Sequence, residues 1–352
     1  MAVVKTEAYF NSSDKIHKIR TLIWNDDKLT PIGVVQLAHG MAEHIDRYDD
    51  FARFLASNGF VVCGNDHLGH GKSVNDPSEL GFFAEKDGDK RIVDDMHILT
   101  KIMKKRYPDI PYFLFGHSMG SFCARVYTAH FGYELNGAIY CGTGELPSTA
   151  VMLQPIVDSL CEKYGPSKRV EALGELFSKA TNLTVSEKTE DGLAWISANV
   201  QNRENYKNDP LCGFTFTIGG YRDLFALANE ASSRQWASLV PNELPILIIS
   251  GAHDPVGLNG KGVISVLSNI LPQVAHDIAQ TALDGDFKKS AELQLKYLEL
   301  CNAMFMDVNP IPVKVAMRMM GIDVGPLRLP LCDMTPANTE KLKSVLQKYE
   351  LI

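Results

Sequence analysis

Residues 111–129 read PYFLFGHSMGSFCARVYTA, and this stretch decides the fold. The apolar run at its start predicts a buried strand, and the run after Gly120 predicts a helix. Between them lies Gly116-His117-Ser118-Met119-Gly120, a G-x-S-x-G sequence. The two glycines allow a strand and a helix to approach closely around a strained turn, from which the serine hydroxyl projects. We therefore expect Ser118 to be a nucleophile at the end of a sheet, although the same pattern also occurs by chance in glycine-rich loops.

Short strand-like runs alternate with helical patterns on both sides of this turn. They lie at residues 17–25, 33–38, 60–65, 111–115, 136–141 and 245–250. The later runs are continuously apolar, which is typical of strands covered on both faces. This alternation predicts an α/β fold with a mostly parallel sheet. Residues 145–235 interrupt the alternation and predict a helical insertion.

A serine hydroxyl is a weak nucleophile, so the sequence should also supply its helpers. These are a general base, an acid that orients the base, and donors for the oxyanion that forms on the attacked carbonyl. Met41 follows an apolar strand, so its backbone N–H can be such a donor together with that of Met119, and His39 is then structural. Asp254 follows the strand at 245–250 and comes after the serine, as the acid does in sheets of this kind. A solvated loop aspartate is the alternative interpretation of Asp254.

The composition is that of an ordinary globular protein. Hydrophobic residues make up 45% of the 352 residues and charged residues 22%, which excludes disordered, collagenous and membrane proteins. The formal net charge is -7 and no long block carries one sign, so we expect no nucleic-acid partner. The length allows roughly two domains.

The seven cysteines are widely separated and never spaced as C-x-x-C. Their odd number argues against a disulfide framework, and their spacing argues against a zinc site. The N-terminus lacks the apolar core of a signal peptide, and no apolar run approaches the ~18 residues of a membrane span. We expect a cytoplasmic protein with reduced thiols, no metal ion, no cofactor and no integral membrane segment.

Five motifs follow one another along residues 39–257. They are HGMAEHIDRYDDFARFLASNGF (39–60), NDHLGHGKS (65–73), GHSMGS (116–121), NDPLCGF (208–214) and ISGAHDPVG (249–257). With them, residues 1 to about 260 resemble the monoacylglycerol lipase and lysophospholipase branch of the α/β-hydrolases. The resemblance implies a helical cap formed by residues 145–235, and a small-molecule carboxylic ester with an acyl chain as substrate. It also carries the family's nucleophile, oxyanion-hole and acid positions over to Ser118, Met41, Met119 and Asp254.

The catalytic base of that family has no clear counterpart in this sequence. In the family the base follows the acid, on a short loop between the last strand and the last helix. The only histidine beyond Asp254 is His276. Apolar spacing places His276 within a helix at residues 271–283 rather than on such a loop. His276 is therefore a candidate base without the expected setting.

Four further motifs follow the hydrolase-like part. They are GKGVISVLSNILPQ (260–273), ALDGDF (282–287), MDVNPIPVKVAMRMMG (306–321) and LRLPL (327–331). With them, residues from about 260 to 352 resemble the C-terminal part of dihydrodipicolinate synthase, a TIM-barrel lyase that condenses pyruvate with aspartate semialdehyde. The resemblance implies that GVISV is the eighth barrel strand and that Ile264 occupies an active-site position. It also implies that the segments that follow form a helical domain.

The tail residues themselves predict a short strand at 262–267 and then helices. Residues 287–306 predict a helix whose apolar face consists of Phe287, Ala291, Leu295, Leu298 and Phe305. Thr335-Pro336 predicts an N-cap followed by proline at the first helical position.

The tail alone cannot perform the lyase chemistry. A (β/α)8 barrel needs about 250 residues. The Schiff-base lysine, the tyrosine motif and the T-T-G-E loop of the lyase family have no match in residues 1–260, where Gly142-Thr143-Gly144-Glu145 is only a superficial echo. A lyase is therefore the weakest functional hypothesis.

The two resemblances meet at residues 259–263, NGKGV, which suit either family. We infer that the chain is a chimera joined at this stretch. The join should leave a sheet edge uncovered and apolar tail helices without the barrel on which they would pack, so we expect self-association through the tail helices. Three hypotheses follow for the function: a serine hydrolase of carboxylic esters, a catalytically impaired hydrolase scaffold that binds acyl esters, and a lyase.

Overall fold

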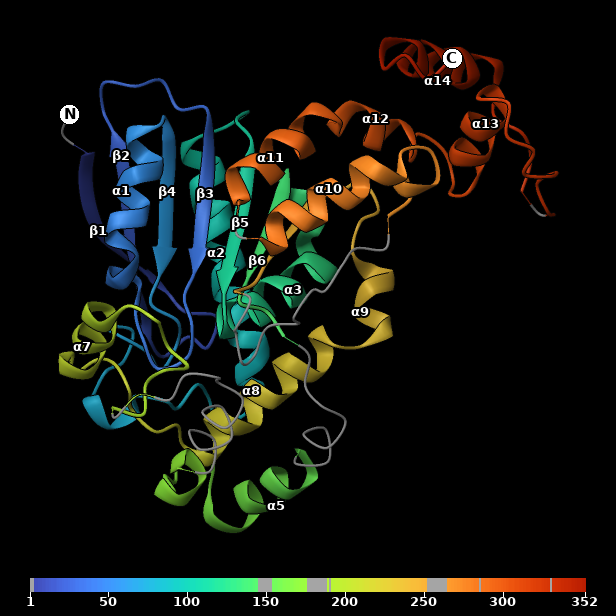
Figure 1. Cartoon of the computed structure of the whole chain (residues 1–352). Helices are drawn as coiled ribbons and strands as arrows, with labels where there is room; N and C mark the ends of the chain where they lie inside the picture. The colour runs from blue at the N-terminus through green and yellow to red at the C-terminus, as the bar shows by residue number, and fades with distance from the viewer. Residues whose placement is uncertain are drawn as a thin grey trace. The chain divides into compact units, whose positions relative to one another are not determined.

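The computed structural model describes residues 3–144, 154–175, 189, 191–251, 265–284, 286–329 and 331–352. The chain divides into two compact units, Met1–Asn259 and Gly260–Ile352 (Figure 1). The boundary falls in the stretch where the two sequence resemblances meet.

A mostly parallel sheet forms the centre of the first unit, as the sequence predicts. In the described residues it has seven strands in the order β1-β2-β4-β3-β5-β6-β7. The strands are β1 (Val3–Asn11), β2 (Lys18–Asp26), β3 (Gly33–Ala38), β4 (Phe60–Asn65), β5 (Tyr112–His117), β6 (Gly137–Cys141) and β7 (Ile246–Ile249). The pairs β1–β2 and β2–β4 are antiparallel, and all other neighbours are parallel.

Strand β1 was not predicted from the sequence. Most of its side chains are exposed, so the sequence VVKTEAYFN carries no buried periodicity. The strand forms because it pairs with β2 along its whole length, from Val3 opposite Asp26 to Asn11 opposite Lys18. Such pairing depends on a partner strand rather than on the strand's own pattern.

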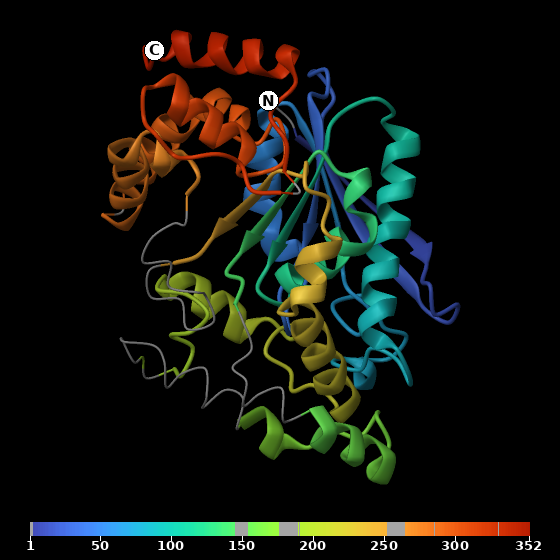
Figure 2. The same ribbon diagram turned by 90° about the vertical axis from the view of Figure 1, so that its right-hand side faces the viewer.

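Helices cover both faces of the sheet (Figures 1 and 2). In this unit they are α1 (Asp49–Ser57), α2 (Gly88–Arg106), α3 (Met119–Phe131), α5 (Gln154–Tyr164), α7 (Val200–Asn208), α8 (Ile218–Ala231) and α9 (Arg234–Leu239), with short 3-10 turns η1 (Ile45–Tyr48), η2 (Pro77–Glu79) and η3 (Gly132–Glu134). Residues of β3 alternate between the two faces: Val35 and Leu37 pack with α1, whereas Val34 and Ala38 share the larger cluster with α2, α3 and α8.

The described parts of the predicted insertion, residues 145–235, contain helices α5, α7 and α8 and the start of α9, joined by irregular segments. Helix α8 lies against α2 and α3, and its Ile218, Leu224 and Leu227 belong to the main buried cluster of the unit. The C-terminal part of the insertion is therefore one of the layers that cover the sheet. Residues 145–153, 176–188 and 190 lie outside the described residues.

Strand β7 ends the sheet in the described residues, and its side chains are exposed. The exposed fractions are 37% for Ile246, 53% for Leu247, 59% for Ile248 and 41% for Ile249. The sequence predicts this strand correctly, but its expected burial on both faces is wrong for the described part of the chain. An apolar edge strand of this kind is a site for pairing with another chain.

The second unit is helical where it is described. It contains η4 (Leu267–Asn269), α10 (Pro272–Leu283), α11 (Phe287–Lys296), α12 (Leu298–Ala303), α13 (Ile311–Met319) and α14 (Pro336–Lys348). Its own buried cluster includes Leu300, Met304, Ile311, Leu342 and Leu346. No helix in the described residues of either unit combines the length and apolarity needed to cross a membrane.

Two tail predictions need correction, and one is confirmed. The predicted helix 287–306 is divided at Tyr297, so its apolar residues do not share one buried face: Leu295 is 69% exposed and Phe305 53%. Residues 265–267 of the predicted strand form a bend and the start of a 3-10 turn, while residues 262–264 lie outside the described part. As predicted, Thr335 caps α14: its hydroxyl accepts a hydrogen bond from the Asn338 N–H, at 3.2 Å.

We predict that the exposed apolar side chains of both units cause reversible self-association. Leu247→Lys in β7 and Leu295→Lys in α11 should each raise the monomer fraction in sedimentation velocity, because a charge opposes both edge pairing and apolar contact. Both side chains are exposed, so the free energy of unfolding should change by less than about 0.5 kcal/mol.

The control is Leu244→Ala, since Leu244 is a buried leucine two residues before β7. It should cost about 2–5 kcal/mol of stability and leave the association surfaces intact. A wild-type protein that sediments only as a monomer at high concentration would contradict the prediction.

Candidate active site

Ser118 lies in the turn between β5 and α3 and has a strained backbone. Its φ is 52° and its ψ is -121°, a backbone conformation that residues other than glycine rarely adopt. Two neighbours hold it: the Ser118 N–H donates to the Cys141 carbonyl at 2.9 Å, and the Ser121 N–H donates to the Ser118 carbonyl at 2.8 Å. The turn is thereby fixed to β6 on one side and to α3 on the other.

Gly116 and Gly120 make this turn sterically possible. A Cβ atom on Gly116 would lie 2.3 Å from the carbonyl oxygen of Gly120. A Cβ atom on Gly120 would lie 2.1 Å from the carbonyl oxygen of Ala38, at the end of β3. Both distances are far below van der Waals contact, so only glycine permits α3 to begin this close to β3.

The loop that carries Met41 lies directly beside Ser118. A Cβ atom built on Gly40 would be 3.3 Å from the Cβ atom of Ser118. Met119 follows the serine as the buried first residue of α3. The structure thus brings together three of the predicted site residues: Ser118, Met119 and Met41.

Glu43 holds this loop through hydrogen bonds, and this role was not predicted from the sequence. Its carboxylate accepts hydrogen bonds from the Gly40 N–H at 2.6 Å, the Tyr48 hydroxyl at 2.7 Å and Arg47 Nε at 2.8 Å. Burial and the adjacent Glu43 carboxylate raise the pKa of Tyr48 well above its usual value, so the phenol stays protonated as a donor. An acidic residue three positions after Gly40 is the only sequence signal of this arrangement.

His39 is structural in this geometry, as the sequence analysis expects. Its Nε2 accepts a hydrogen bond from the His67 N–H at 2.9 Å, so its proton lies on Nδ1, which donates to the Gly40 carbonyl at 2.8 Å. Burial and the neighbouring His70 lower the pKa of His39 well below its usual value. Both ring nitrogens of the neutral side chain are occupied, which leaves none to accept a proton from Ser118.

The described residues contain no histidine ring hydrogen-bonded to Ser118. Three histidines outside the loop pair with carboxylates, namely His17 with Asp14, His97 with Glu134 and His130 with Glu230. His276 lies in α10 of the second unit, where its side chain is 62% exposed and 3.3 Å from Asp277 Oδ1. Asp254 and His253 lie outside the described residues.

Comparison with known families gives the context of this site. Residues 30–274 match the family described as serine aminopeptidase, S33. The chain belongs to the serine aminopeptidase S33 family. Its second segment, residues 250–349, also matches the dihydrodipicolinate synthetase family. These matches confirm both sequence resemblances and agree with a chimeric chain.

Solved structures of esterases and lipases resemble the S33 part of the chain. A thermostable carboxyl esterase from Bacillus coagulans, solved with glycerol, is 34% identical, with 74% of this chain and 84% of the esterase covered and a TM-score of 0.67. A soluble variant of the monoglyceride lipase from Saccharomyces cerevisiae shares the fold, with 18% identity, 73% and 80% coverage and a TM-score of 0.57. The α/β-hydrolase fold predicted from the sequence is confirmed.

The curated relatives that match the chain are 4-hydroxy-tetrahydrodipicolinate synthases. The 4-hydroxy-tetrahydrodipicolinate synthase of Acetivibrio thermocellus is 50% identical over 109 residues, which are 30% of this chain and 37% of that protein. The enzyme of Clostridium tetani matches over the same length with the same identity and coverage. The chain thus spans well under half the length of these relatives.

We predict that buried neutral histidines beside the site make the first unit sensitive to acid. His70 packs among the rings of Phe83, Phe214 and Phe216, with centroids 5.3–5.4 Å away, and burial together with His67 lowers its pKa to about 3. Below pH 6.5 the unfolded chain therefore binds a proton at His70 that the folded chain does not. The free energy of unfolding thus decreases as the pH is lowered. His70→Phe should reduce the loss of stability between pH 7 and pH 5 by about 1–2 kcal/mol.

Urea unfolding followed by tryptophan fluorescence measures this effect, because all three tryptophans, at positions 24, 195 and 236, lie in the first unit. His276→Phe in the second unit is the control and should leave the pH dependence unchanged. Equal pH dependence in His70→Phe and wild type would show that His70 does not titrate as described.

Proposed function

We propose that the protein hydrolyses carboxylic esters through an acyl-enzyme formed on Ser118. The observation that carries this proposal is the strained turn at Ser118, with the Met119 N–H and the Gly40–Met41 loop beside it. A serine held at positive φ between a strand and a helix is the arrangement of a nucleophile elbow. The 34% identity to a carboxyl esterase supports an ester rather than an amide as substrate.

In the proposed mechanism, Ser118 Oγ attacks the acyl carbonyl while a base removes its proton. The backbone N–H groups of Met119 and Met41 donate to the oxyanion of the tetrahedral intermediate. The intermediate collapses, the alcohol leaves with a proton from the base, and water then cleaves the acyl-enzyme by the same steps. Asp254 is the proposed acid, and His276 the proposed base, because it is the histidine that follows the acid at a distance in the chain.

The substrate class that we propose is a glycerol ester with one acyl chain, of the monoacylglycerol or lysophospholipid type. The sequence motifs of the first unit support this class. The Bacillus coagulans esterase, solved with glycerol bound, lends further support.

A fluorophosphonate probe tests the nucleophile. Wild-type protein should be labelled once, and Ser118→Ala should not be labelled, as measured by intact mass. Ser238→Ala removes an exposed hydroxyl in α9 and should be labelled like wild type. Negligible labelling of a wild-type sample that circular dichroism shows to be folded would contradict the proposal.

The same probe tests the base. If His276 is the base, His276→Ala should slow labelling of Ser118 by about 10²–10⁴-fold, the usual contribution of general base catalysis. Undiminished labelling in His276→Ala would exclude that role.

A catalytically impaired scaffold is the second candidate. It is favoured by one observation: in the described residues Ser118 has no hydrogen bond to a histidine. Such a scaffold would retain only the residual ~10³–10⁴-fold rate over water that oxyanion donors and binding supply. It would bind a non-hydrolysable acyl phosphonate or ether analogue without reacting rapidly with the probe, which separates it from the active hydrolase.

We predict no lyase chemistry from the tail, because it covers only 37% of its curated relative. Incubation with pyruvate and sodium borohydride should leave the intact mass unchanged, since the Schiff-base lysine of the lyase family has no match in residues 1–260. A mass increase equal to one reduced pyruvate adduct, lost at a single Lys→Arg substitution, would reverse this conclusion.

A further inference from the structure

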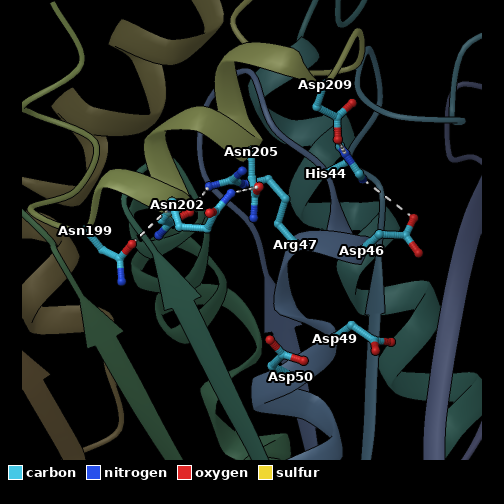
Figure 3. Close-up of a pocket in the computed structure, with 10 residues that line it drawn as sticks. His44, Asp46, Arg47, Asp49, Asp50, Asn199, Asn202, Asn205 and Asp209 are labelled. Carbon is cyan, nitrogen blue, oxygen red and sulfur yellow. Dashed lines mark hydrogen bonds and ion pairs between the residues drawn. The ribbon is translucent and has the colours of Figure 1, made fainter. Parts of the chain in front are cut away.

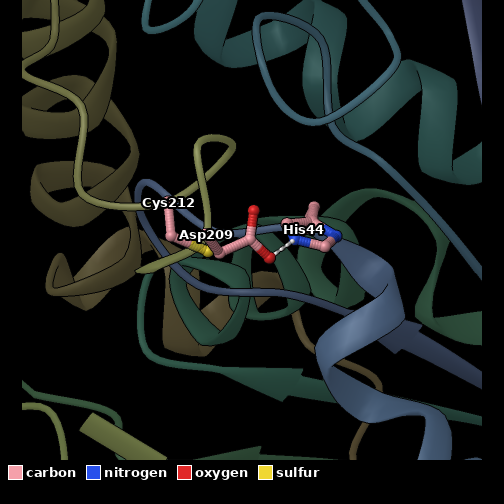
Figure 4. Close-up of side chains that lie close together, drawn as sticks. All are labelled: His44, Asp209 and Cys212. Atoms are coloured by element: carbon pink, nitrogen blue, oxygen red, sulfur yellow. Dashed lines mark hydrogen bonds and ion pairs between the residues drawn. The ribbon is translucent and has the colours of Figure 1, made fainter. Parts of the chain in front are cut away.

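His44, Asp209 and Cys212 converge from distant parts of the first unit (Figure 4). His44 lies in the loop after β3, whereas Asp209 and Cys212 lie directly after α7. One ligand atom from each side chain lies within 4.8 Å of the other two. His44 Nε2 and Asp209 Oδ2 are 2.8 Å apart.

We propose that these three side chains form a zinc site that fastens the loop beside Ser118 to the segment after α7. An imidazole, a carboxylate and a thiolate are ligands that Zn²⁺ accepts together, at about 2.0–2.3 Å in tetrahedral geometry. A thiolate disfavours Mg²⁺ and Ca²⁺, which take oxygen ligands. Tetrahedral ligands at these lengths lie about 3.3–3.6 Å apart. Metal binding therefore requires the His44–Asp209 contact of 2.8 Å to open slightly, and the Cys212 thiolate, which lies within 4.8 Å of both atoms, to take up such a distance.

The second ring nitrogen of His44 supports the metal site. His44 is only 6% exposed, and its Nδ1 is buried without a hydrogen-bond partner, 3.6 Å from Asp46 Oδ2. Asp46 is itself held by Arg20 Nη1 at 2.6 Å and Lys5 Nζ at 2.7 Å. A histidine that binds a metal through one nitrogen usually presents the other to a carboxylate, which fixes the tautomer and the ring orientation.

The adjoining cavity gives water access to the site (Figure 3). It measures about 490 Å³, and its described lining includes one arginine, Arg47, against four aspartates: Asp46, Asp49, Asp50 and Asp209. Lys5 and Arg20 pair with Asp46, and Lys5 and Arg53 pair with Asp49, so part of this negative charge is already compensated. Because His44 and Asp209 also line the cavity, water can enter and fill the fourth coordination position.

A zinc ion here would add to two hydrogen bonds that already join the loop of residues 40–48 to the segment 199–213. The Gly213 N–H, next to Cys212, donates to the Ala42 carbonyl at 2.9 Å, and Arg47 Nη2 donates to Asn202 Oδ1 at 2.9 Å. The proposed role of the ion is therefore to hold these two segments together, and it does not depend on the chemistry proposed for Ser118.

Without the ion, His44 and Asp209 form an ion pair. Burial lowers the pKa of His44, but its interactions with Asp46, Cys212 and Asp209 outweigh this effect and raise the pKa to about 10. A proton and a metal ion thus compete for the same position, and zinc binding should release a proton.

Cobalt(II) and zinc(II) titrations of the metal-free, reduced full-length protein test the site. One equivalent of Co²⁺ should produce the charge-transfer absorption of a cobalt thiolate, and Zn²⁺ should displace it and raise the melting temperature. Cys212→Ser should abolish this absorption and weaken zinc binding by more than about 100-fold, since outer-shell changes alone cost 10–100-fold. Cys332→Ser is the matched control, because Cys332 is an exposed cysteine in the second unit.

Asp209→Asn and Asp46→Asn extend the test, with circular dichroism to confirm folding. Asp209→Asn should weaken zinc binding while the thiolate absorption persists at high Co²⁺, and Asp46→Asn should weaken it by about 10–100-fold. The proposal is overturned if folded wild type binds no zinc at micromolar concentration, or if Cys212→Ser binds zinc and cobalt as wild type does.

Discussion

The site depends on one steric constraint, the approach of the first turn of α3 to the end of β3. With 2.1 Å between a Cβ at Gly120 and the carbonyl of Ala38, no side chain fits at this contact. The approach forces Ser118 into its positive φ and places the N-terminus of α3 beside the Gly40 loop. The positive end of the helix dipole then points to the position beside Ser118 where the proposed mechanism places the oxyanion.

Local patterns made the centre of the fold predictable. Strands such as β3 and β4 are short apolar runs between turn residues, and the serine turn is determined by glycine sterics, so both are visible in a single sequence. Strand β1 and the break at Tyr297 could not be predicted, because pairing and packing with distant residues decide them. The His44–Asp209 contact spans 165 positions in the chain, and no spacing rule for metal ligands reaches so far.

The chimeric character of the chain explains where the local sequence pattern predicts burial but the fold leaves apolar side chains exposed. Each segment follows the patterns of its own family, with residues 30–274 matching one and 250–349 the other. The first unit keeps a well-packed cluster around α3, and the second has a small cluster around Leu300. In the described residues, apolar side chains are exposed on β7 and at Leu295 of α11, as expected for frustration in a chain joined from two families.

The exposed strand β7 has a consequence for the lifetime of the protein in a cell. Chaperones and proteases recognise extended apolar segments with free backbone groups, which in most proteins appear only after unfolding. Ile246–Ile249 offers such a segment in the folded state. Chaperones and proteases should therefore act on the folded chain. Its abundance in the cell should depend on the accessibility of the β7 edge of the sheet rather than on the free energy of unfolding.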